Sequence, residues 1–210
     1  MNKVKKYLRI VKYYEACLEK HGDSHLGVDW PKIEDVDVRH RVMLGVSKEP
    51  VSQKLTLLDF GCGVSHLYEY IKRNNLGHID YYGLDLSEKF IELCRKKFPE
   101  NIYYCADVIE YPGSIPDFDY IVMNGIFTEK RELTFDEMLL YFKELLSIVF
   151  SKAKKGVAFN VMSKAVDWER EDLFHLPTDI LIDFLKKDIT RNFVIRNDYG
   201  LYEYTVYIYK

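Results

Sequence analysis

Apolar residues follow two different spacings along the chain, and the spacing changes near residue 50. Before this point apolar side chains recur every three to four residues, which predicts an amphipathic helix. The positions that carry this pattern are Val4, Leu8, Val11, Tyr14 and Leu18. Residues 21–31 contain two glycines and a proline and are predicted as a loop, and a second helix is predicted over 33–46. Residues 1–50 are therefore predicted to form a helical cap within the same domain as the rest of the chain.

From residue 51 to residue 210, short apolar runs alternate with amphipathic segments. The runs predicted as strands are 55–58, 79–84, 102–105, 120–123 and 156–162. The segments predicted as helices are 64–73, 87–98, 134–152 and 178–187. Continuous apolar strands that alternate with helices are typical of a parallel sheet covered on both faces.

Two helix starts and the C-terminal segment add detail to this fold. Ser87 is expected to cap the helix that follows it, and Thr134 and Glu137 have the spacing of a capping box. Two β-rich runs at 191–197 and 202–209 are separated by only four residues, and so short a connection permits only an antiparallel pair. The predicted fold class is α/β, a doubly wound and mostly parallel seven-stranded sheet that ends in an antiparallel hairpin.

A glycine-rich turn, Asp59-Phe60-Gly61-Cys62-Gly63, follows the first predicted strand. Glycine lets the backbone turn tightly and approach a ligand that a Cβ atom would block. Asp85 ends the next predicted strand, where an acid is placed to accept hydrogen bonds from ribose hydroxyls. The alternative for Asp85 is a structural role at the start of the next helix. Together, the turn and the acid predict a ligand of the nucleotide type.

Two cofactor classes use this arrangement. A dinucleotide places its pyrophosphate on a helix N-terminus and favours the full spacing G-x-G-x-x-G. In this chain the third glycine position holds His66, so that fingerprint is broken. S-adenosylmethionine has no phosphate, and its amino-acid part needs only the close approach that Gly61 and Gly63 allow. S-adenosylmethionine is therefore the predicted cofactor, and a nicotinamide-dependent oxidoreductase is the alternative.

Four segments resemble, in order, the motifs of the class I S-adenosylmethionine-dependent methyltransferases. LLDFGCGVS resembles motif I, YYGLDLS the ribose-binding motif, YYCADVIEY the adenine-binding motif and FDYIVMNGIF the fourth-strand motif. The resemblance is close over residues 54–127, and Ser65 stands where many relatives have a third glycine. It implies a Rossmann-like fold, with residues 51–210 as the cofactor-binding domain, and methyl transfer as the activity.

The same resemblance implies a set of cofactor contacts. The residues expected along the methionine part are Asp59, Gly61 and Gly63; those expected at the ribose and beside the adenine are Asp85 and Leu86. Those expected at the adenine amino group and ring are Asp107 and the Val108 amide, and those expected beside the transferable methyl group are Asn124 and Gly125.

A segment before motif I, Arg39-His40-Arg41-Val42-Met43, resembles one that in some bacterial relatives supplies an arginine to the cofactor carboxylate. A guanidinium forms a two-pronged contact with a carboxylate, so the chemistry is reasonable. Arg39 is the first choice for this role and Arg41 the second. The alternative for both is a solvated helix face.

The methyl group of a sulfonium is already activated, so a general base is needed only for a nucleophile that arrives protonated. The candidates for catalysis are His66, Glu129 and His175, each with a surface or structural role as the alternative. The polar and aromatic segment 21–30 is interpreted as a lid, and 163–175 as a second loop at the same edge of the sheet.

Net charge and cysteine content exclude some classes of binding partner and of metal site. The net charge of -3 argues against a nucleic-acid binder, which usually carries a concentrated basic excess. The four cysteines form no C-x-x-C pair, and no metal site is predicted. The N-terminal segment lacks an unbroken apolar core of a signal peptide, and no run approaches a membrane span, so a cytoplasmic protein is expected.

A small molecule remains as the predicted acceptor. The hypothesis is methyl transfer to an oxygen or nitrogen nucleophile of a metabolite, sugar or sugar nucleotide, with surface-polysaccharide biosynthesis as an analogy only. Besides the oxidoreductase, a second alternative is a non-catalytic protein that binds S-adenosylmethionine as the partner of another enzyme. The chain gives no prediction of oligomeric state.

Overall fold

The cap predicted at the N-terminus is helical in the computed structural model, which describes residues 5–210. It consists of α1 (Leu8–His21), a 3-10 turn η1 (His25–Val28) and α2 (Glu34–Leu44). Val4, which belongs to the predicted helix pattern, lies outside the described residues. No helix within 5–210 is long and apolar enough to cross a lipid bilayer.

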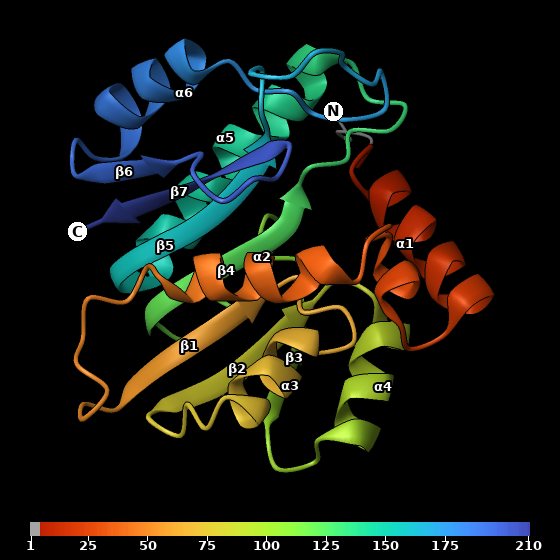
Figure 1. Cartoon of the computed structure of the whole chain (residues 1–210), viewed down its shortest axis with the longest axis vertical. Coiled ribbons are helices and arrows are strands. Elements are labelled where there is room, and N and C mark those ends of the chain that lie inside the picture. The colour runs from red at the N-terminus through yellow and green to blue at the C-terminus, as the bar shows by residue number, and fades with distance from the viewer. Residues whose placement is uncertain (1–4) are drawn as a thin grey trace.

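Seven strands form one sheet in the order β3-β2-β1-β4-β5-β7-β6 (Figure 1). Their bounds are β1 Leu55–Phe60, β2 Ile79–Asp85, β3 Ile102–Cys105, β4 Phe118–Phe127, β5 Ala153–Met162, β6 Phe193–Arg196 and β7 Glu203–Tyr209. The first five strands are parallel, and β7 pairs antiparallel with both β5 and β6. The predicted fold class, including the closing hairpin, is confirmed.

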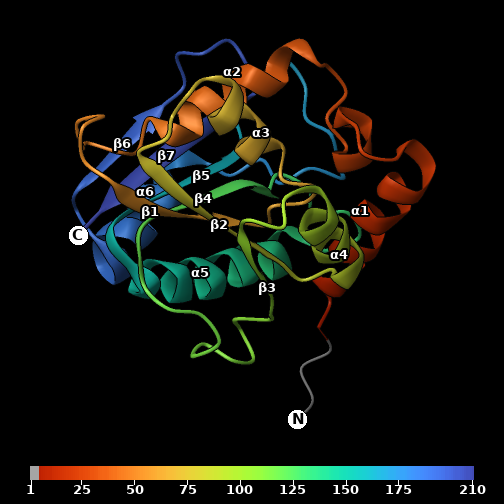
Figure 2. The same ribbon diagram turned by 90° about the horizontal axis from the view of Figure 1, so that it is seen from below.

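Helices cover both faces of this sheet. Figure 2 shows α2 and α3 on one face and α5 on the other. The remaining bounds are α3 His66–Arg73, α4 Glu88–Lys97, α5 Phe135–Lys152 and α6 Thr178–Phe184, which continues as a π turn over Leu185–Ile189. In the sheet, β2 lies on one side of β1 and β4 on the other, so the connections that leave β1 and β3 go to opposite sides. At such a switch point the carboxyl ends of β1 and β4 open a crevice of the kind where ligands bind in this architecture.

Two helix starts were predicted, and one of them differs from its prediction. Thr134 and Glu137 form the reciprocal capping box at the start of α5, as predicted. Ser87 stands at the N-cap of α4, but its hydroxyl makes no capping bond and instead donates to Glu15 Oε1 of α1 at 2.6 Å. The prediction of a Ser87 side-chain cap was therefore wrong, because a carboxylate from helix α1 lies within reach of the hydroxyl.

The strand β4 is longer than its apolar run. It begins before the predicted stretch 120–123, because the polar side chain of Asp119 is satisfied inside the sheet. Its Oδ2 accepts hydrogen bonds from the amide of Thr56 at 2.9 Å and from the Thr56 hydroxyl at 3.1 Å. At the other end, β4 passes through Asn124 and Gly125 to Phe127, which extends the strand into the crevice.

Candidate active site

The turn after β1 has a backbone that requires glycine. Gly61 and Gly63 have φ of +75° and +51°, in the left-handed region that side chains disfavour. The amides of Gly61 and Cys62 both donate to the carbonyl oxygen of Leu84 on β2, at 2.7 and 2.9 Å. A Cβ atom on Gly61 would lie 2.0 Å from Cδ1 of Ile126, so a larger residue would have to displace that side chain as well as adopt a disfavoured backbone angle.

A cavity with about 970 Å³ of empty space, its open mouth included, lies above this turn. It brings together eight of the residues predicted at the site, namely Asp59, Gly61, Gly63, His66, Asp85, Leu86, Asn124 and Gly125. We call it the first cavity. Its other walls come from α1, the lid (residues 21–30) and α5, so the N-terminal segment closes a crevice that the sheet opens.

Asp85 lies at the end of β2 and holds the glycine turn in place. Its Oδ2 accepts from the amide of Gly63 at 3.0 Å, and its Oδ1 accepts from the amide of Ser87 at 2.9 Å. Burial raises the pKa of Asp85 to about 6, against the opposing effect of these amides. A carboxylate with two oxygens beside a cavity retains lone pairs for ligand hydroxyls.

Asp59 is almost fully buried, with 4% of its surface exposed. Its Oδ2 accepts from the hydroxyl of Tyr81 at 2.9 Å. Burial raises the pKa of Asp59 to about 7, although the Tyr81 hydroxyl works in the opposite direction. Asp59 thus braces the underside of the turn as well as lining the cavity.

Asp107 and Val108 follow β3 and do not line the first cavity. The Oδ2 atom of Asp107 accepts from the hydroxyl of Tyr7 at 2.7 Å and from Nζ of Lys5 at 3.2 Å. The ring of Tyr7 stacks on Tyr141 with centroids 5.0 Å apart, and both rings line the cavity. Asp107 is therefore connected to the cavity through Tyr7.

A second cavity opens on the far side of Gly125 and contains about 1320 Å³ of empty space including its open mouth. Two residues, Trp30 and Gly125, line both cavities. A Cβ atom on Gly125 would lie 3.7 Å from Nε1 of Trp30, so the indole sits directly over this glycine. The two cavities are consequently neighbours, with Trp30 and Gly125 as their common border.

Glu129, one of the predicted catalytic residues, lines the second cavity and is only 6% exposed. Its Oε2 accepts from NH1 of Arg131 at 3.2 Å. Burial raises the pKa of Glu129 to about 7, and the Arg131 contact only partly offsets this effect. The same Arg131 nitrogen donates to Asp172 at 3.2 Å, so Glu129 shares its cation.

His175, a second predicted catalytic residue, is buried in the wall of the second cavity. Its Nδ1 lies 2.7 Å from the carbonyl oxygen of Ser163, so we assign the proton to Nδ1. Nε2 then carries a lone pair, which accepts from the amide of Arg170 in a long contact of 3.4 Å. The imidazole is thus held in a tautomer that can accept a proton.

Arg39 lines the second cavity rather than the first. Its Nε donates to both carboxylate oxygens of Glu203, and its guanidinium lies 5.3 Å from the ring centre of Trp30. Arg41, the second choice for the same role, is exposed on α2. The pairing of either arginine with a cofactor carboxylate stays a prediction.

Asn160 of β5 connects these elements. Its Oδ1 accepts from the amide of Gly125 at 2.8 Å, and its Nδ2 donates to Glu203 Oε1 at 2.9 Å. Asn160 therefore holds the backbone of Gly125 in position. Gly125 has φ of +88° and lines both cavities.

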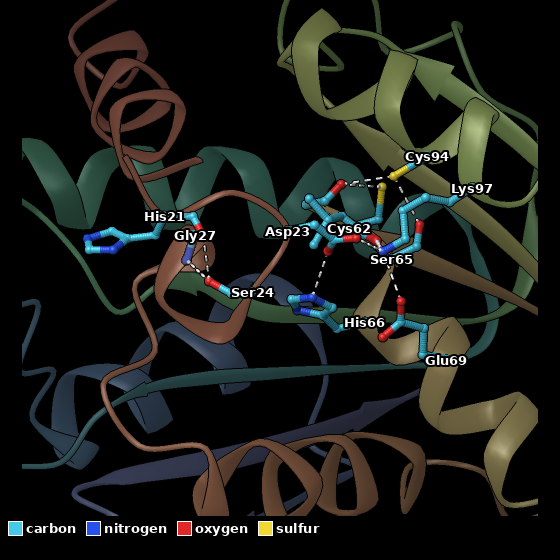
Figure 3. Close-up of polar contacts among 12 residues, drawn as sticks. His21, Asp23, Ser24, Gly27, Cys62, Ser65, His66, Glu69, Cys94 and Lys97 are labelled. Atoms are coloured by element: carbon cyan, nitrogen blue, oxygen red, sulfur yellow. Dashed lines mark hydrogen bonds and ion pairs between the residues drawn. The ribbon is translucent and has the colours of Figure 1, made fainter. Parts of the chain in front are cut away.

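His66, the third predicted catalytic residue, lines the first cavity at the start of α3. Its Nε2 lies 3.2 Å from Oδ1 of Asp23 in the lid (Figure 3). Burial lowers the pKa of His66, so the imidazole is neutral near pH 7 and Nε2 donates its hydrogen to Asp23.

Sequence reasoning missed most of the aromatic wall of the first cavity. Tyr7, Tyr14 and Tyr141 line it, and only Tyr14 entered the sequence pattern, as part of an apolar helix face. Tyr7 and Tyr14 are seven residues apart and so lie on one face of a helix, which was the available signal. Nothing in the sequence indicates that this face covers a ligand cavity instead of a packed core.

The residues at the first cavity fit S-adenosylmethionine. Two glycines provide a cradle that Cβ atoms would fill, a carboxylate stands at the end of β2, and aromatic and aliphatic side chains form an apolar wall. Nδ2 of Asn124, the residue before Gly125, is buried and lacks a hydrogen-bond partner among the described residues. Such a donor calls for an acceptor from a ligand. Within 5–210 no group of three or more His, Cys, Asp or Glu residues is placed to hold a metal ion.

Comparisons with known proteins agree with this fit. The family described as "Methyltransferase domain" matches residues 58–147. A protein named "Putative methyltransferase Rv1506c", from Mycobacterium tuberculosis, is 26% identical over 157 residues, which cover 72% of this chain and 91% of that protein.

Solved structures extend the likeness in fold to the whole chain. Magnesium protoporphyrin IX methyltransferase from Synechocystis PCC 6803, with bound S-adenosylmethionine, superposes with a TM-score of 0.66 at 14% identity, over 100% of this chain and 99% of that chain. The 1,6-didemethyltoxoflavin N1-methyltransferase of Burkholderia thailandensis gives a TM-score of 0.63 at 13% identity, over 100% of this chain and 92% of that one.

Proposed function

We propose that the chain is a class I S-adenosylmethionine-dependent methyltransferase that binds S-adenosylmethionine in the first cavity and methylates a small molecule held in the second, which the methyltransferase-domain match and the similar proteins support. The observation that carries the proposal is the junction of the two cavities at Trp30 and Gly125. Transfer of a methyl group requires donor and acceptor to meet in line, and this junction is where two ligands could do so.

The proposed cofactor contacts follow the walls of the first cavity. Asp85 would accept from the ribose hydroxyls, Leu86 would flank the adenine, and Asp59, Gly61 and Gly63 would surround the methionine part. Asn124 and Gly125 would lie beside the sulfonium. Asp107 would accept from the adenine amino group and the Val108 amide would donate to the adenine ring. One oxygen of Asp107 already accepts from the hydroxyl of Tyr7. When bound, S-adenosylmethionine supplies a methyl group that is already activated toward nucleophiles.

For the acceptor we propose a hydroxyl or amino group on a metabolite, sugar or sugar nucleotide. Two structural neighbours that span the whole chain are named for small-molecule substrates, magnesium protoporphyrin IX and 1,6-didemethyltoxoflavin. Trp30 and Trp168 in the walls of the second cavity favour a ligand with an apolar or planar face.

Glu129 is the residue we propose as the proton acceptor. It is buried beside the second cavity, and a carboxyl whose pKa is near 7 can take a proton and release it again at neutral pH. The acceptor oxygen or nitrogen would form its new bond to the methyl carbon as the carbon–sulfur bond breaks and its electron pair goes to sulfur. The proton of the acceptor would pass to Glu129 and then to water.

His175 and His66 have different positions relative to this step. The Nε2 lone pair of His175 makes it the second candidate for the proton. His66 lines the first cavity and not the second, which favours a role on the cofactor side.

Calorimetric titration tests the proposal directly. We expect the protein to bind S-adenosylhomocysteine in the micromolar range and to give no heat with NAD. Asp85→Ala should weaken S-adenosylhomocysteine by at least about tenfold, because it removes a charged acceptor of ligand hydroxyls and also loosens the turn at Gly63. Exposed Asp80→Ala, on the same strand, is the control. NAD binding without S-adenosylhomocysteine binding would contradict the proposal.

A further inference from the structure

The lid, residues 21–30, covers Gly63 of the turn after β1 and Gly125 of β4. Cγ1 of Val28 lies 3.1 Å from where a Cβ atom on Gly63 would stand, so Val28 rests on the glycine turn. Trp30, two residues further on, lies over Gly125 with its Nε1 3.7 Å from the corresponding position. A ligand that enters or leaves the first cavity past the glycine turn must therefore displace this segment.

Internal contacts make the lid a compact unit rather than a loose loop. The amide of Gly27 donates to the carbonyl and to the side-chain oxygen of Ser24, at 3.0 and 3.2 Å. A Cβ atom on Gly27 would lie 2.0 Å from the carbonyl oxygen of Gly22, which shows how tightly the segment folds on itself. Gly22 has φ of +64° and ends α1, a position suited to absorb a change of backbone angle.

One side chain fastens this unit to the cofactor side of the molecule. Asp23 accepts from Nε2 of His66 at 3.2 Å and from Nζ of Lys97 at 2.6 Å (Figure 3). The His66 and Lys97 side chains are 15% and 17% exposed and that of Asp23 is 35% exposed, so these contacts are partly shielded from water.

Lys97, the partner of Asp23, also contacts the segment after the glycine turn and helix α3. Its Nζ donates to the carbonyl oxygen of Val64 at 3.0 Å and lies 2.8 Å from Glu69 Oε1. Lys97 is held by these two partners whether or not Asp23 is present. Asp23 is therefore the movable half of the contact, and the receiving half stays in place when the lid opens.

We propose that Asp23 is the latch of the lid and that its contacts with His66 and Lys97 set the rate at which the cofactor enters and leaves the first cavity. The inference rests on the proposed position of the cofactor in that cavity. Because Asp23 and Lys97 do not line the cavity, and only their partner His66 does, we expect the latch to stabilise the closed lid about equally with and without ligand. Its loss should raise the association and dissociation rates together and leave the equilibrium affinity nearly unchanged.

Stopped-flow fluorescence with S-adenosylhomocysteine tests this. The chain has two tryptophans, so a Trp168→Phe background leaves Trp30 in the lid as the single reporter. In that background we expect Asp23→Asn to raise both rates about fivefold or more, which corresponds to the loss of a partly shielded ion pair and a hydrogen bond. The dissociation constant should change by less than about twofold, since both rates change together.

A matched control separates the latch from general loosening of the cap. Glu19 pairs with Lys89, which also joins the cap to α4 but outside the lid, so Glu19→Gln should leave both rates unchanged. Hydrogen exchange provides a readout without ligand: the amide of Gly27 should exchange faster in Asp23→Asn than in Glu19→Gln.

Two results would overturn the latch. One is an unchanged association rate in Asp23→Asn, and the other is a rise in the dissociation rate alone with a matching loss of affinity. Failure of the cofactor position itself would appear differently, as an Asp85→Ala variant that binds S-adenosylhomocysteine as tightly as the unaltered protein.

Discussion

Arg39 donates from Nε to both carboxylate oxygens of Glu203, at 3.3 and 3.1 Å, on the wall of the second cavity. Glu203 is 3% exposed, so removal of the arginine leaves a buried charge without its cation. We expect Arg39→Ala to lower the free energy of unfolding by about 3 kcal/mol in a urea titration. Affinity for S-adenosylhomocysteine should change by less than about threefold, because Arg39 does not line the first cavity.

The double variant Arg39→Ala with Glu203→Gln serves as the control for this pair. Removing the carboxylate as well should recover part of the lost stability, since no unpaired charge then remains buried. A loss of S-adenosylhomocysteine affinity of tenfold or more in Arg39→Ala alone would instead support the pairing with the cofactor carboxylate that the sequence resemblance implies.

Glu129 and Asp172 accept from the same nitrogen of Arg131, each at 3.2 Å, but only Glu129 lines the second cavity. We expect Glu129→Gln to lower kcat by about a hundredfold or more with a hydroxyl acceptor found in a substrate screen, as for loss of a general base. The rate should rise as the pH rises through about 7, because the carboxyl must be ionised to accept a proton. This acid limb should vanish in the variant.

Asp172→Asn is the matched variant, since it removes the other carboxylate from Arg131 while leaving Glu129 in place. Its pH–rate profile should keep the acid limb. Equal losses of kcat in the two variants would show that the ion pairs matter for structure and that Glu129 takes no proton.

Asp59 makes stability depend on pH in the direction opposite to a salt-bridged carboxylate. Its pKa is raised from 3.8 to about 7 by burial, so the folded state holds the proton more tightly than the unfolded state. The resulting stabilisation is complete below about pH 4 and is lost as the pH rises toward 7. Asp59→Asn should remove about 2 kcal/mol of the decline in unfolding free energy between pH 5 and pH 8.

The measurement is a series of urea titrations of the ligand-free protein across that pH range. Asp80→Asn, at an exposed position on β2, should keep the slope of the unaltered protein. Parallel curves for Asp59→Asn and the unaltered protein would contradict the prediction.

Asp107 offers a test of the adenine edge. Its Oδ2 faces the hydroxyl of Tyr7 in this structure, whereas the sequence resemblance places the adenine amino group there. If the carboxylate accepts from that amino group, the inosine analogue of S-adenosylhomocysteine, which lacks it, should bind about tenfold more weakly. Asp107→Ala should bind both compounds equally, and a variant that still discriminates would remove Asp107 from the adenine edge.

Local patterns in the sequence predicted the fold well, because each depends on residues close in the chain. The capping box at Thr134 and Glu137 and the glycine turn before α3 are of this kind. Continuous apolar strands predicted the mostly parallel sheet and a short connection predicted its antiparallel hairpin, whereas the order of the strands was not predicted. The Ser87 cap was wrong for the opposite reason, since the group that takes its hydroxyl, Glu15, is 72 residues away in the chain.

The site was less accessible to sequence reasoning because its walls are made by distant segments. The contact between Asn160 and the amide of Gly125 spans 35 residues, and that between Arg39 and Glu203 spans 164. No spacing rule relates residues so far apart. The glycines were identifiable because the turn they form is local, and Asp85 because it ends the next predicted strand. The position of Trp30 over Gly125 depends instead on how the cap packs.

The shared wall at Trp30 has a thermodynamic consequence. A single side chain that borders both cavities cannot shift for one ligand without changing the space left for the other. Donor and acceptor binding are then linked by one coupling free energy, and linkage requires the effect to be reciprocal. If the acceptor changes the affinity for S-adenosylhomocysteine by some factor, S-adenosylhomocysteine must change the affinity for the acceptor by the same factor. The potency of an inhibitor that binds one cavity would then depend on the ligand in the other cavity.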